Sequence, residues 1–499
     1  MGRDSGGSLV ASPRAGAHGP VSGLDGFQDS DVSGGCMTSA STAPATEQPK
    51  SPLDRLLSLA ADVRAGEGVT VLLLALNGFL LLAAYYCIRP VRSALLLTQD
   101  LRLPGGVVLP GDELTSYLGA VLAALFLVIV PLYSAFASRV NRIRLINSTT
   151  AFFIVTLMAF YFAASSAAYP VAVGILFYLW IGVFNLMVIA QFWSFANDLY
   201  TPEQGKRLFA IVGFGGSVGA VAGAFMTSRL ATQLGPVGMM VVAAVILATC
   251  LVLTNTIDFR DRRTRGGSVT KQRPQEESIG GRGGFQLVLG RPYLLAIGLL
   301  TLTAQVVNTN GNYILNATVR GMAAAAEAAG GAAAAQVVLG TMAGVDFWQN
   351  TLAMAIQFFL VSRIFKYLGI GGALFVLPVI ALGSYGLFAF APVLSMIRIA
   401  KITENATDYS LQNTVRRALF LPTSREAKYK ALQAVETFFW RAGDLLSSIA
   451  VLLFIRNLQL SLQAFVFVNI LAVGAWLAIA AFLARENRRL TAEPERVAA

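Results

Sequence analysis

Long apolar segments, separated by short polar or basic stretches, follow one another along most of the chain. A helix needs about 20 apolar residues to cross the roughly 30 Å hydrocarbon core of a bilayer, and each segment has about this length. Glycine, proline or polar residues interrupt several of them, but the pattern predicts a transmembrane helix at each of twelve positions. These are residues 69–88, 114–134, 145–166, 170–196, 207–231, 236–256, 292–316, 341–361, 368–390, 391–413, 431–455 and 461–484.

The polar stretches around these segments predict the remaining organisation. The first stretch is rich in Gly, Ser, Ala and Pro and has few large apolar residues, which indicates disorder. The next has apolar positions at helical spacing, which favours an amphipathic helix on the membrane surface. In chain order we expect a disordered cytoplasmic tail (1–52), an interfacial helix (53–68), a first half of six helices (69–256), a cytoplasmic linker (257–291), a second half of six helices (292–484) and a cytoplasmic tail (485–499).

The two halves repeat short basic motifs at a nearly constant offset. Ala137–Arg142 reads Ala-Ser-Arg-Val-Asn-Arg, and Val361–Lys366 reads Val-Ser-Arg-Ile-Phe-Lys. Two parallel repeats of six helices are the architecture of the major facilitator fold, whose substrate site lies near the middle of the membrane between the halves. The predicted fold class is therefore an all-α polytopic membrane protein with twelve transmembrane helices in two six-helix halves, of major facilitator type.

Lysine and arginine are concentrated in alternate connections between the apolar segments, and the net charge of the chain is +11. Basic connections stay in the cytoplasm, so the asymmetry predicts a multi-pass protein of the cell inner (cytoplasmic) membrane with both termini cytoplasmic. Because the charge lies in loops between apolar helices, we expect contact with the lipid bilayer and no binding of nucleic acid.

Few residues suited to metal binding or catalysis are present. The chain has three cysteines and one histidine, His18, without any spacing that indicates a metal site. We therefore expect no metal and no cofactor. There is also no Walker A sequence, so the protein is not expected to be an enzyme that hydrolyses nucleotides, or an enzyme of another kind. We expect it to be a monomer.

The segment 391–413 differs from the others because it is charged. Its polar residues share one helical face, which carries Arg398, Lys401, Asn405, Asp408 and Gln412. A charged side chain at mid-membrane costs at least about 2.5–3.5 kcal/mol, so this face must meet a wet cavity or opposite charges. We predict that it lines a translocation pathway. The alternative is a structural strip, in which Glu404 and Asp408 neutralise Arg398 and Lys401.

Further polar residues lie within or at the ends of apolar segments. Arg89 and Arg92 are spaced i, i+3 at the end of the first segment, and their forked donors suit phosphate or carboxylate. The alternative is that both side chains reach the outer headgroups. Asn308 and Asn312 belong to an amide face in the seventh segment, and Asn185 plays a comparable part in the fourth. Such amides favour hydrogen bonds either to a substrate or to a neighbouring helix.

Glycines recur every fourth residue in the fifth segment, at Gly215, Gly219 and Gly223. A similar run occurs in dinucleotide-binding loops, but no strand precedes this one. The spacing predicts close packing of this helix against another.

Several of these stretches together resemble one transporter family over residues 53–485. The chain is similar to the ATP:ADP antiporter family, which comprises the nucleotide translocases of plastids and obligate intracellular bacteria and a broad branch of bacterial relatives. The resemblance rests on Ala83–Arg92, Phe192–Leu199, Lys401–Leu411, Leu421–Lys430 and Phe438–Arg441. It implies exchange of nucleotides, or transport of another phosphorylated anion, by alternating access.

The resemblance also implies roles for single residues. The basic pair of the family's first span corresponds to Arg89 and Arg92, and the basic residue that follows the Tyr-Ser of the tenth span corresponds to Arg416. The acidic residue of the fourth span falls at Ile181, and that of the seventh is replaced by an amide near Asn308. These departures place the chain nearer to the bacterial branch than to the nucleotide exchangers.

These observations predict a secondary transporter of an anionic, phosphorylated small molecule, with an ATP/ADP-type nucleotide as the leading candidate. The expected substrate-binding residues are Arg89, Arg92, Asn185, Asn308, Asn312, Lys401, Glu404, Asp408 and Arg416. One alternative is a proton-coupled exporter of other small molecules, in which Glu404, Asp408 or Asp346 carries the proton. Another is a membrane scaffold or sensor that transports nothing, in which the polar helices only hold the bundle together.

Overall fold

The computed structural model describes residues 51–58, 62–137, 140–166, 171–264, 284–390, 393–424 and 426–498, and almost all of them are helical. The α-helices of the first part are α1 (Pro52–Leu57), α2 (Gly68–Leu97), α3 (Gly111–Ala137), α4 (Arg142–Ala164), α5 (Val171–Leu199), α6 (Pro202–Thr264) and α7 (Gly284–Leu289). Those that follow are α8 (Pro292–Ala328), α9 (Ala334–Ala355), α10 (Val361–Phe390), α11 (Leu394–Thr407), α12 (Asn413–Ala418), α13 (Leu432–Ala434), α14 (Trp440–Ala450) and α15 (Leu462–Ala498).

π-Helical turns interrupt the α-helices in the second part. They are η1 (Ile356–Leu360), η2 (Asp408–Gln412), η3 (Ala427–Ala431), η4 (Val435–Phe439) and η5 (Val451–Asn457), and within the described chain none lies before Ile356. Such turns are rare and occur frequently at functional sites.

Nine helices in the described chain are long and apolar enough to cross a membrane. Two of them, Arg207–Arg263 and Ala334–Phe390, are 57 residues long. Each turns back at a glycine with positive φ, Gly235 at 61° and Gly369 at 65°, a conformation that a residue without a Cβ adopts at little cost. The continuous helix formed by α11, η2 and α12 supplies a further crossing that its charges hide from a hydropathy criterion. The arrangement is consistent with the twelve predicted crossings.

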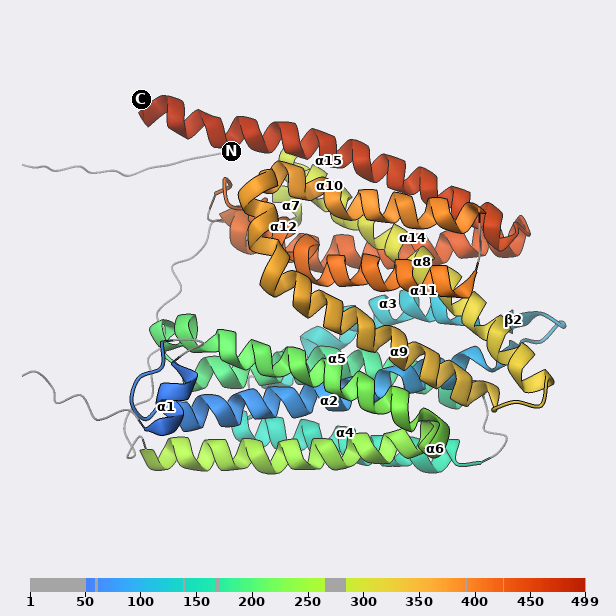
Figure 1. The fold of residues 1–499 in the computed structure, drawn as a ribbon, viewed down its shortest axis with the longest axis horizontal. Coiled ribbons are helices and arrows are strands. Elements are labelled where there is room, and N and C mark those ends of the chain that lie inside the picture. The colour runs from blue at the N-terminus through green and yellow to red at the C-terminus, as the bar shows by residue number, and fades with distance from the viewer. Residues whose placement is uncertain are drawn as a thin grey trace, which may run out of the picture. The chain divides into compact units, whose positions relative to one another are not determined.

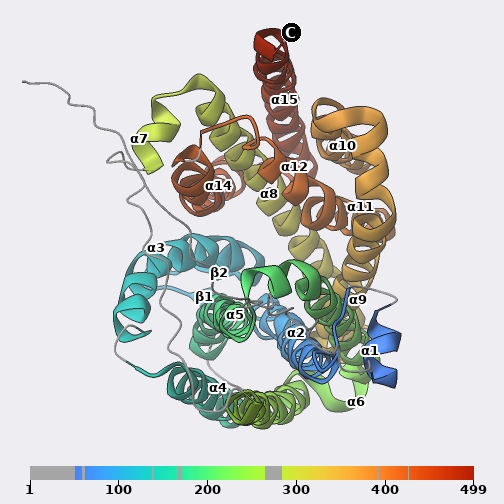
Figure 2. The ribbon, with the colours of Figure 1, turned by 90° about the vertical axis from the view of Figure 1, so that its left-hand side faces the viewer.

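The crossings form two groups. Figure 1 shows α2 to α6 in one group and α8 to α15 in the other, and the long helices run in similar directions. In the end-on view of Figure 2, α9 lies beside α2 and α6. α14 packs against α3, so the two groups meet along two separate seams.

The glycines at four-residue spacing in α6 lie against α2, as predicted. A Cβ added at Gly219 would collide with the carbonyl oxygen of Phe79, and one at Gly223 would collide with that of Ala83. Since the backbones themselves are in contact, α2 and α6 form a tightly packed pair.

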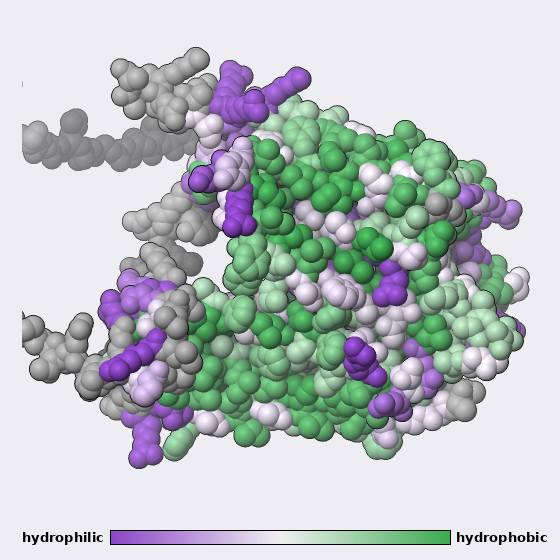
Figure 3. Space-filling view, viewed as in Figure 1, coloured by the Kyte–Doolittle hydropathy of each residue, from purple (hydrophilic) through white to green (hydrophobic). Residues whose placement is uncertain are grey.

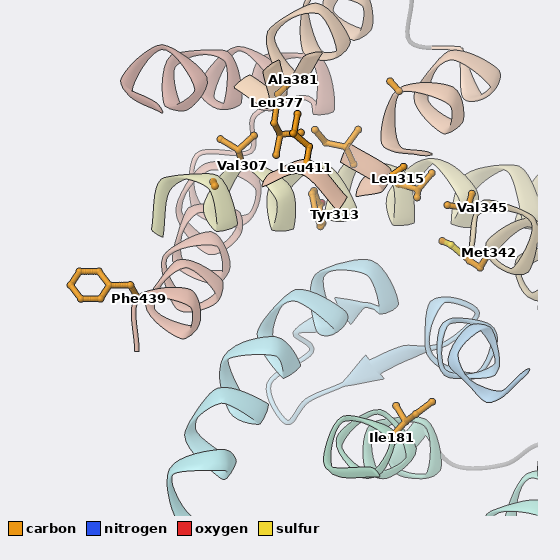
Figure 4. Packing of buried hydrophobic residues seen from close by; sticks show 14 of the residues in the cluster. Ile181, Val307, Tyr313, Leu315, Met342, Val345, Leu377, Ala381, Leu411 and Phe439 are labelled. Atoms are coloured by element: carbon orange, nitrogen blue, oxygen red, sulfur yellow. The ribbon is translucent and has the colours of Figure 1, made fainter. Parts of the chain in front are cut away.

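Apolar side chains cover the outside of the helices and also fill the space between them. In Figure 3 most of the visible face is hydrophobic, and hydrophilic residues gather mainly towards the two ends of the helices. Figure 4 shows part of the interior, where Val307 of α8, Leu377 and Ala381 of α10 and Leu411 of η2 meet. An apolar outer surface along the helices is what a lipid environment requires.

The region before the first crossing differs from the prediction of a helix over 53–68. Helix α1 ends at Leu57, and the carboxylate of its Asp54 accepts hydrogen bonds from the backbone amides of Gly66 and Gly68 at 3.2 and 2.9 Å. Asp54 thereby satisfies free donors at the start of α2. Hydrogen bonds from the Ser51 side chain and the Gly66 amide lower the pKa of Asp54 to about 2.

The other predicted domain boundaries can be compared only in part. Helix α6 continues to Thr264 and α15 to Ala498, so helical structure extends past the boundaries set at 256 and 484. Most of the predicted tail 1–52, and residues 265–283 of the predicted linker, lie outside the described residues. The assignment of cytoplasmic sides and the membrane-surface role of 53–68 stay predictions.

A β-hairpin that the sequence pattern did not predict joins α2 to α3. Strand β1 (Asp100–Arg102) pairs antiparallel with β2 (Val108–Pro110), and the turn contains Gly105 and Gly106 at positive φ. Ion pairs between the two helix groups cluster at this end of the molecule, as described below.

Candidate functional site

A polar cavity of about 320 Å³ lies between the two helix groups. Its wall is formed by α2, α3 and α5 of the first group and by α8, α9, α11 with η2, and α14 of the second. The volume falls within the range usual for small-molecule sites. A polar cavity between the two helix groups is the arrangement that the charged tenth crossing predicted.

Six charged side chains line this cavity. The cations are Arg89, Arg92 and Arg441, and the anions are Asp346, Asp408 and Asp444. Four of the six are paired: Arg89 contacts Asp346 at 3.0 Å, and Arg441 contacts Asp444 at 3.2 Å. Arg92 and Asp408 remain without an ion-pair partner in the described chain.

The two arginines of α2 therefore occupy different environments. Arg89 reaches across from the first helix group to Asp346 on α9, and its guanidinium also lies 5.5 Å from the ring centre of Tyr86. Arg92 packs its guanidinium over the Tyr178 ring at 4.6 Å, and its Nε atom is buried with no hydrogen-bond partner among the described residues. Neither side chain reaches out along the helix end as the headgroup alternative required, since both line the cavity.

Amide side chains of the second group form a directed chain along the wall. Asn312 donates to Asn308 at 2.9 Å, Asn308 donates to Asn405 at 3.2 Å, and Asn405 donates to Gln349 at 2.9 Å. All four residues line the cavity. The seventh, eighth and tenth crossings thus share one polar face, which includes the predicted residues Asn308 and Asn312.

Asp444 is held by more than its ion pair. Its carboxylate accepts hydrogen bonds from Gln305 at 2.7 Å and from Thr309 at 3.0 Å. These contacts tie α14 to α8 and use the polar residues that the sequence showed on the seventh crossing.

Lys401 and Glu404 lie behind the wall rather than on it. Lys401 is 0% exposed, contacts Glu404 at 3.2 Å and donates to the backbone oxygen of Asn308 at 3.2 Å. Glu404 also accepts a hydrogen bond from Tyr385 at 3.0 Å. The space for this cluster exists because residue 311 is glycine: a Cβ there would collide with the Tyr385 hydroxyl. For this pair, the alternative of an internally neutralised strip describes the structure better than direct contact with the cavity.

Arg416 and Asn185 do not reach the cavity either. Arg416 is buried, with its guanidinium 4.7 Å from the ring centre of Trp440, and Trp440 lines the cavity in front of it. Asn185 is partly buried on α5 and is not part of the cavity wall. Ile181, where the family pattern has an acidic residue, is 1% exposed within the apolar core, and Figure 4 shows it on α5.

The structure adds wall residues that were not among the expected binding residues. They include Tyr178, Asp346, Gln349, Tyr409, Arg441 and Asp444. The spacing of Asp346 and Gln349 on the eighth crossing and of Arg441 and Asp444 on the eleventh was a usable signal, since each pair shares a helix face. No local pattern marks Tyr178. In the described chain, no cluster of His, Cys, Asp and Glu is suited to a metal ion.

Polar contacts join the two helix groups at the β-hairpin and the start of α3. Arg320 of α8 pairs with Asp112 at 2.7 Å and with Asp100 of the hairpin. Arg456 contacts Glu113 at 3.2 Å and the backbone oxygen of Val108 at 3.1 Å. The hairpin and the start of α3 are therefore fastened to the second group in this conformation.

Comparisons with known proteins agree with the fold. No protein-family model matches the chain. The ADP,ATP carrier protein 1 of Chlamydia muridarum (strain MoPn / Nigg) is 21% identical over 294 residues, which are 52% of this chain and 54% of that protein. The chain thus matches about half the length of this curated relative.

Solved transporter structures resemble the chain over most of its length. A bacterial homolog of the human lysosomal transporter Spinster, in an inward-facing and unoccupied conformation, has a TM-score of 0.57 at 14% identity and covers 85% of this chain and 98% of its own. The nucleoside transporter NupG has a TM-score of 0.55 at 14% identity, with 82% and 98% covered. An auto-inhibited peptide transporter of the POT family has a TM-score of 0.57 at 12% identity, with 83% and 96% covered. The predicted fold class is confirmed: this is a multi-pass α-helical membrane protein with the fold of major facilitator-type transporters.

Proposed function

We propose that the protein is a secondary transporter that moves or exchanges an anionic, phosphorylated metabolite by alternating access. An ATP/ADP-type nucleotide is the leading candidate. The observation that carries the proposal is Arg92, a cavity-lining guanidinium without an acidic partner in the described chain.

The physical reason is the cost of a partly desolvated charge. A guanidinium away from bulk water needs an opposite charge or several acceptors, and Arg92 finds only the face of Tyr178. The planar fork of arginine matches phosphate and carboxylate oxygens with two parallel hydrogen bonds. Arg89 lies one turn away on the same helix, so an anion held by Arg92 also attracts the cation that Asp346 now neutralises.

The cavity residues divide into proposed roles. Arg92 and Arg89 bind the anionic group, and Asn308 and Asn312 offer amides to uncharged parts of the substrate. Lys401, Glu404 and Arg416 are proposed to act through their charge and through the shape of the wall, because buried side chains separate them from the cavity. Asn185 has no part in this assignment.

The relative named an ADP,ATP carrier supports the nucleotide as the leading substrate, although it matches only 54% of that protein's length. The proposed activity forms and breaks no covalent bond in the substrate. We further propose, from the basic loops, that the protein lies in the cytoplasmic membrane with both termini inside. A monomer stays the predicted oligomeric state.

A proton-coupled exporter is a second candidate, and one observation favours it. Asp346 lies on the cavity wall in direct contact with Arg89 across the two helix groups, so protonation of this carboxylate would release the arginine. Uptake or efflux that requires an imposed proton gradient and no counter-substrate supports this candidate over exchange.

Counterflow in proteoliposomes tests the proposal. Vesicles loaded with ATP, ADP or phosphate are mixed with the same labelled compound, and the wild type is compared with Arg92→Gln. The matched control is Arg229→Gln, since Arg229 is an arginine on α6 outside the cavity wall, packed on the Phe225 ring at 5.2 Å. We expect exchange by the wild type and the control, and its loss in Arg92→Gln. If the wild type exchanges none of these compounds, the proposal fails.

A further inference from the structure

Two side chains of the second helix group have hydrogen-bonding capacity that no described protein group uses. Asp408 is 7% exposed and lines the cavity, and its carboxylate has no hydrogen bond or ion pair in the described chain. Gln349 is 1% exposed and also lines the cavity, and its Nε2 amide has no hydrogen-bond partner among the described residues. One group is an acceptor and the other is a donor.

These two groups lie close together on the wall. Asn405 and Asp408 are spaced i, i+3 where α11 passes into η2, so they are neighbours on one helix face. Gln349 of α9 is joined to Asn405, whose Nδ2 donates to the Gln349 Oε1 atom at 2.9 Å. Asn405 therefore links Gln349 to the helix face that carries Asp408, and all three residues line the cavity.

The direction of the amide chain follows from this neighbour. The donors run from Asn312 through Asn308 and Asn405, which leaves an NH₂ group free at Gln349. The opposite direction would leave an amide oxygen free at Gln349, on the same cavity wall as the negatively charged Asp408. Asp408 thus favours the arrangement in which a donor is presented next to an acceptor.

A buried carboxylate and a buried amide that have no hydrogen-bond partner among the described residues can be satisfied by the contents of the cavity. We propose that Asp408 and Gln349 form a recognition subsite for the uncharged end of the substrate. The subsite takes a planar group that presents a hydrogen-bond donor beside an acceptor, as the amino-substituted edge of adenine or cytosine does. The inference rests on the proposed function, because Arg92 then holds the anionic end of the same molecule.

The charge pattern of the cavity agrees with a substrate of two unlike ends. Once the pairs Arg89–Asp346 and Arg441–Asp444 are set aside, Arg92 of α2 and Asp408 of η2 remain, one cation and one anion from opposite helix groups. A molecule with an anionic end and a donor-bearing end satisfies both. A simple anion such as inorganic phosphate satisfies only Arg92.

Binding of matched nucleotides to the purified full-length protein tests the subsite. The probes are ATP, purine riboside triphosphate, which lacks the 6-amino donor, and tripolyphosphate, which lacks the base and the sugar. A hydrogen bond to a charged group contributes enough to make ATP bind about 10- to 100-fold more tightly than the desamino analogue. In Asp408→Asn, which keeps the size of the side chain, this ratio is expected to fall towards one.

Asp444→Asn is the matched control. Its carboxylate lines the same cavity but already accepts hydrogen bonds from Gln305 and Thr309. The substitution is expected to change the affinity for both nucleotides by the same factor, so that their ratio is preserved.

Three outcomes would overturn the inference in distinguishable ways. Equal affinity of the wild type for ATP and its desamino analogue, with tripolyphosphate still bound, removes the subsite and leaves the proposed function standing. A wild-type ratio that persists in Asp408→Asn, together with loss of proton-driven uptake, reassigns Asp408 to proton transfer. No binding of any probe, tripolyphosphate included, defeats the proposed function and the subsite with it.

Discussion

The ion pair between Arg89 and Asp346 provides the sharpest test of how the two helix groups are held together at the cavity. The two side chains belong to different helix groups and approach to 3.0 Å, with 20% and 9% of their surfaces exposed. At this distance and an effective dielectric constant of about 20, the gross attraction is about 5 kcal/mol. Desolvation offsets part of it, but removal of one partner leaves the other charge buried and unpaired.

We predict two opposite effects for Asp346→Asn. The free energy of unfolding of the substrate-free protein falls by about 2–4 kcal/mol. The reason is that Arg89 then faces the single amide oxygen of the new asparagine instead of the negatively charged carboxylate of Asp346. Affinity for ATP rises about tenfold or more, because an incoming anion no longer competes with Asp346, and each 1.4 kcal/mol corresponds to a factor of ten. Thermal unfolding in detergent, with and without ATP, measures both effects in one series.

The control for this prediction is Asp198→Asn. Asp198 also pairs with an arginine, Arg142 at 3.4 Å, but 53% of its side chain is exposed and it is not part of the cavity wall. Exposed pairs contribute about 0–1 kcal/mol, so this variant is expected to behave as the wild type. Adding Arg89→Gln to Asp346→Asn should abolish the gain in ATP affinity. The reasoning is refuted if Asp346→Asn leaves both the stability and the ATP affinity unchanged.

Three further predictions concern other parts of the molecule. Gly219→Ala lowers the free energy of unfolding by about 1–3 kcal/mol because its Cβ meets the backbone of α2. Gly213→Ala, with open space around it, keeps or slightly raises the apparent melting temperature in detergent, since alanine favours the helix more than glycine does. The pKa of Asp54 is lowered to about 2, so its contribution to stability is complete above about pH 4 and is lost as the pH falls through 2. Backbone amide hydrogens at the start of α2 should therefore exchange faster in Asp54→Ala than in the wild type at pH 6. This difference should shrink as the pH approaches 2. Arg320→Gln removes the ion pairs to the hairpin and to α3, and spin labels on the hairpin and on the loop before α9 should report longer distances than in Arg229→Gln.

The sequence was sufficient for the crossings because their apolar composition is a local property. It was also sufficient for the tenth crossing, whose charges fall on one face whatever the neighbours are. It could not show how far each charge on that face lies from the cavity. Lys401 and Glu404 share the face with Asp408, yet only Asp408 reaches the wall. The depth of the other two depends on Tyr385 and on the absence of a side chain at Gly311, which belong to other helices.

The pairing of the arginines was not predictable for the same reason. Arg89 and Arg92 are both arginines on α2, and a single sequence gives no ground for assigning them different environments. Their environments differ because Asp346 and Tyr178 approach from α9 and α5, far away along the chain. Local spacing marked which residues face inward, whereas the contacts between distant helices decide which of them is left to meet a ligand.

The uneven distribution of the π-helical turns has a mechanical consequence. An α-helix with an unbroken hydrogen-bond ladder is stiff, whereas each π-helical turn contains an extra residue whose position along the ladder can shift. In the described chain these turns occur only from Ile356 onwards, while α2 and α6 in the first helix group touch backbone to backbone. We expect the first helix group to move as a rigid body and the second group to bend more easily. The bending should be greatest at η2, in the helix that carries Asp408, as the pathway changes its accessible side.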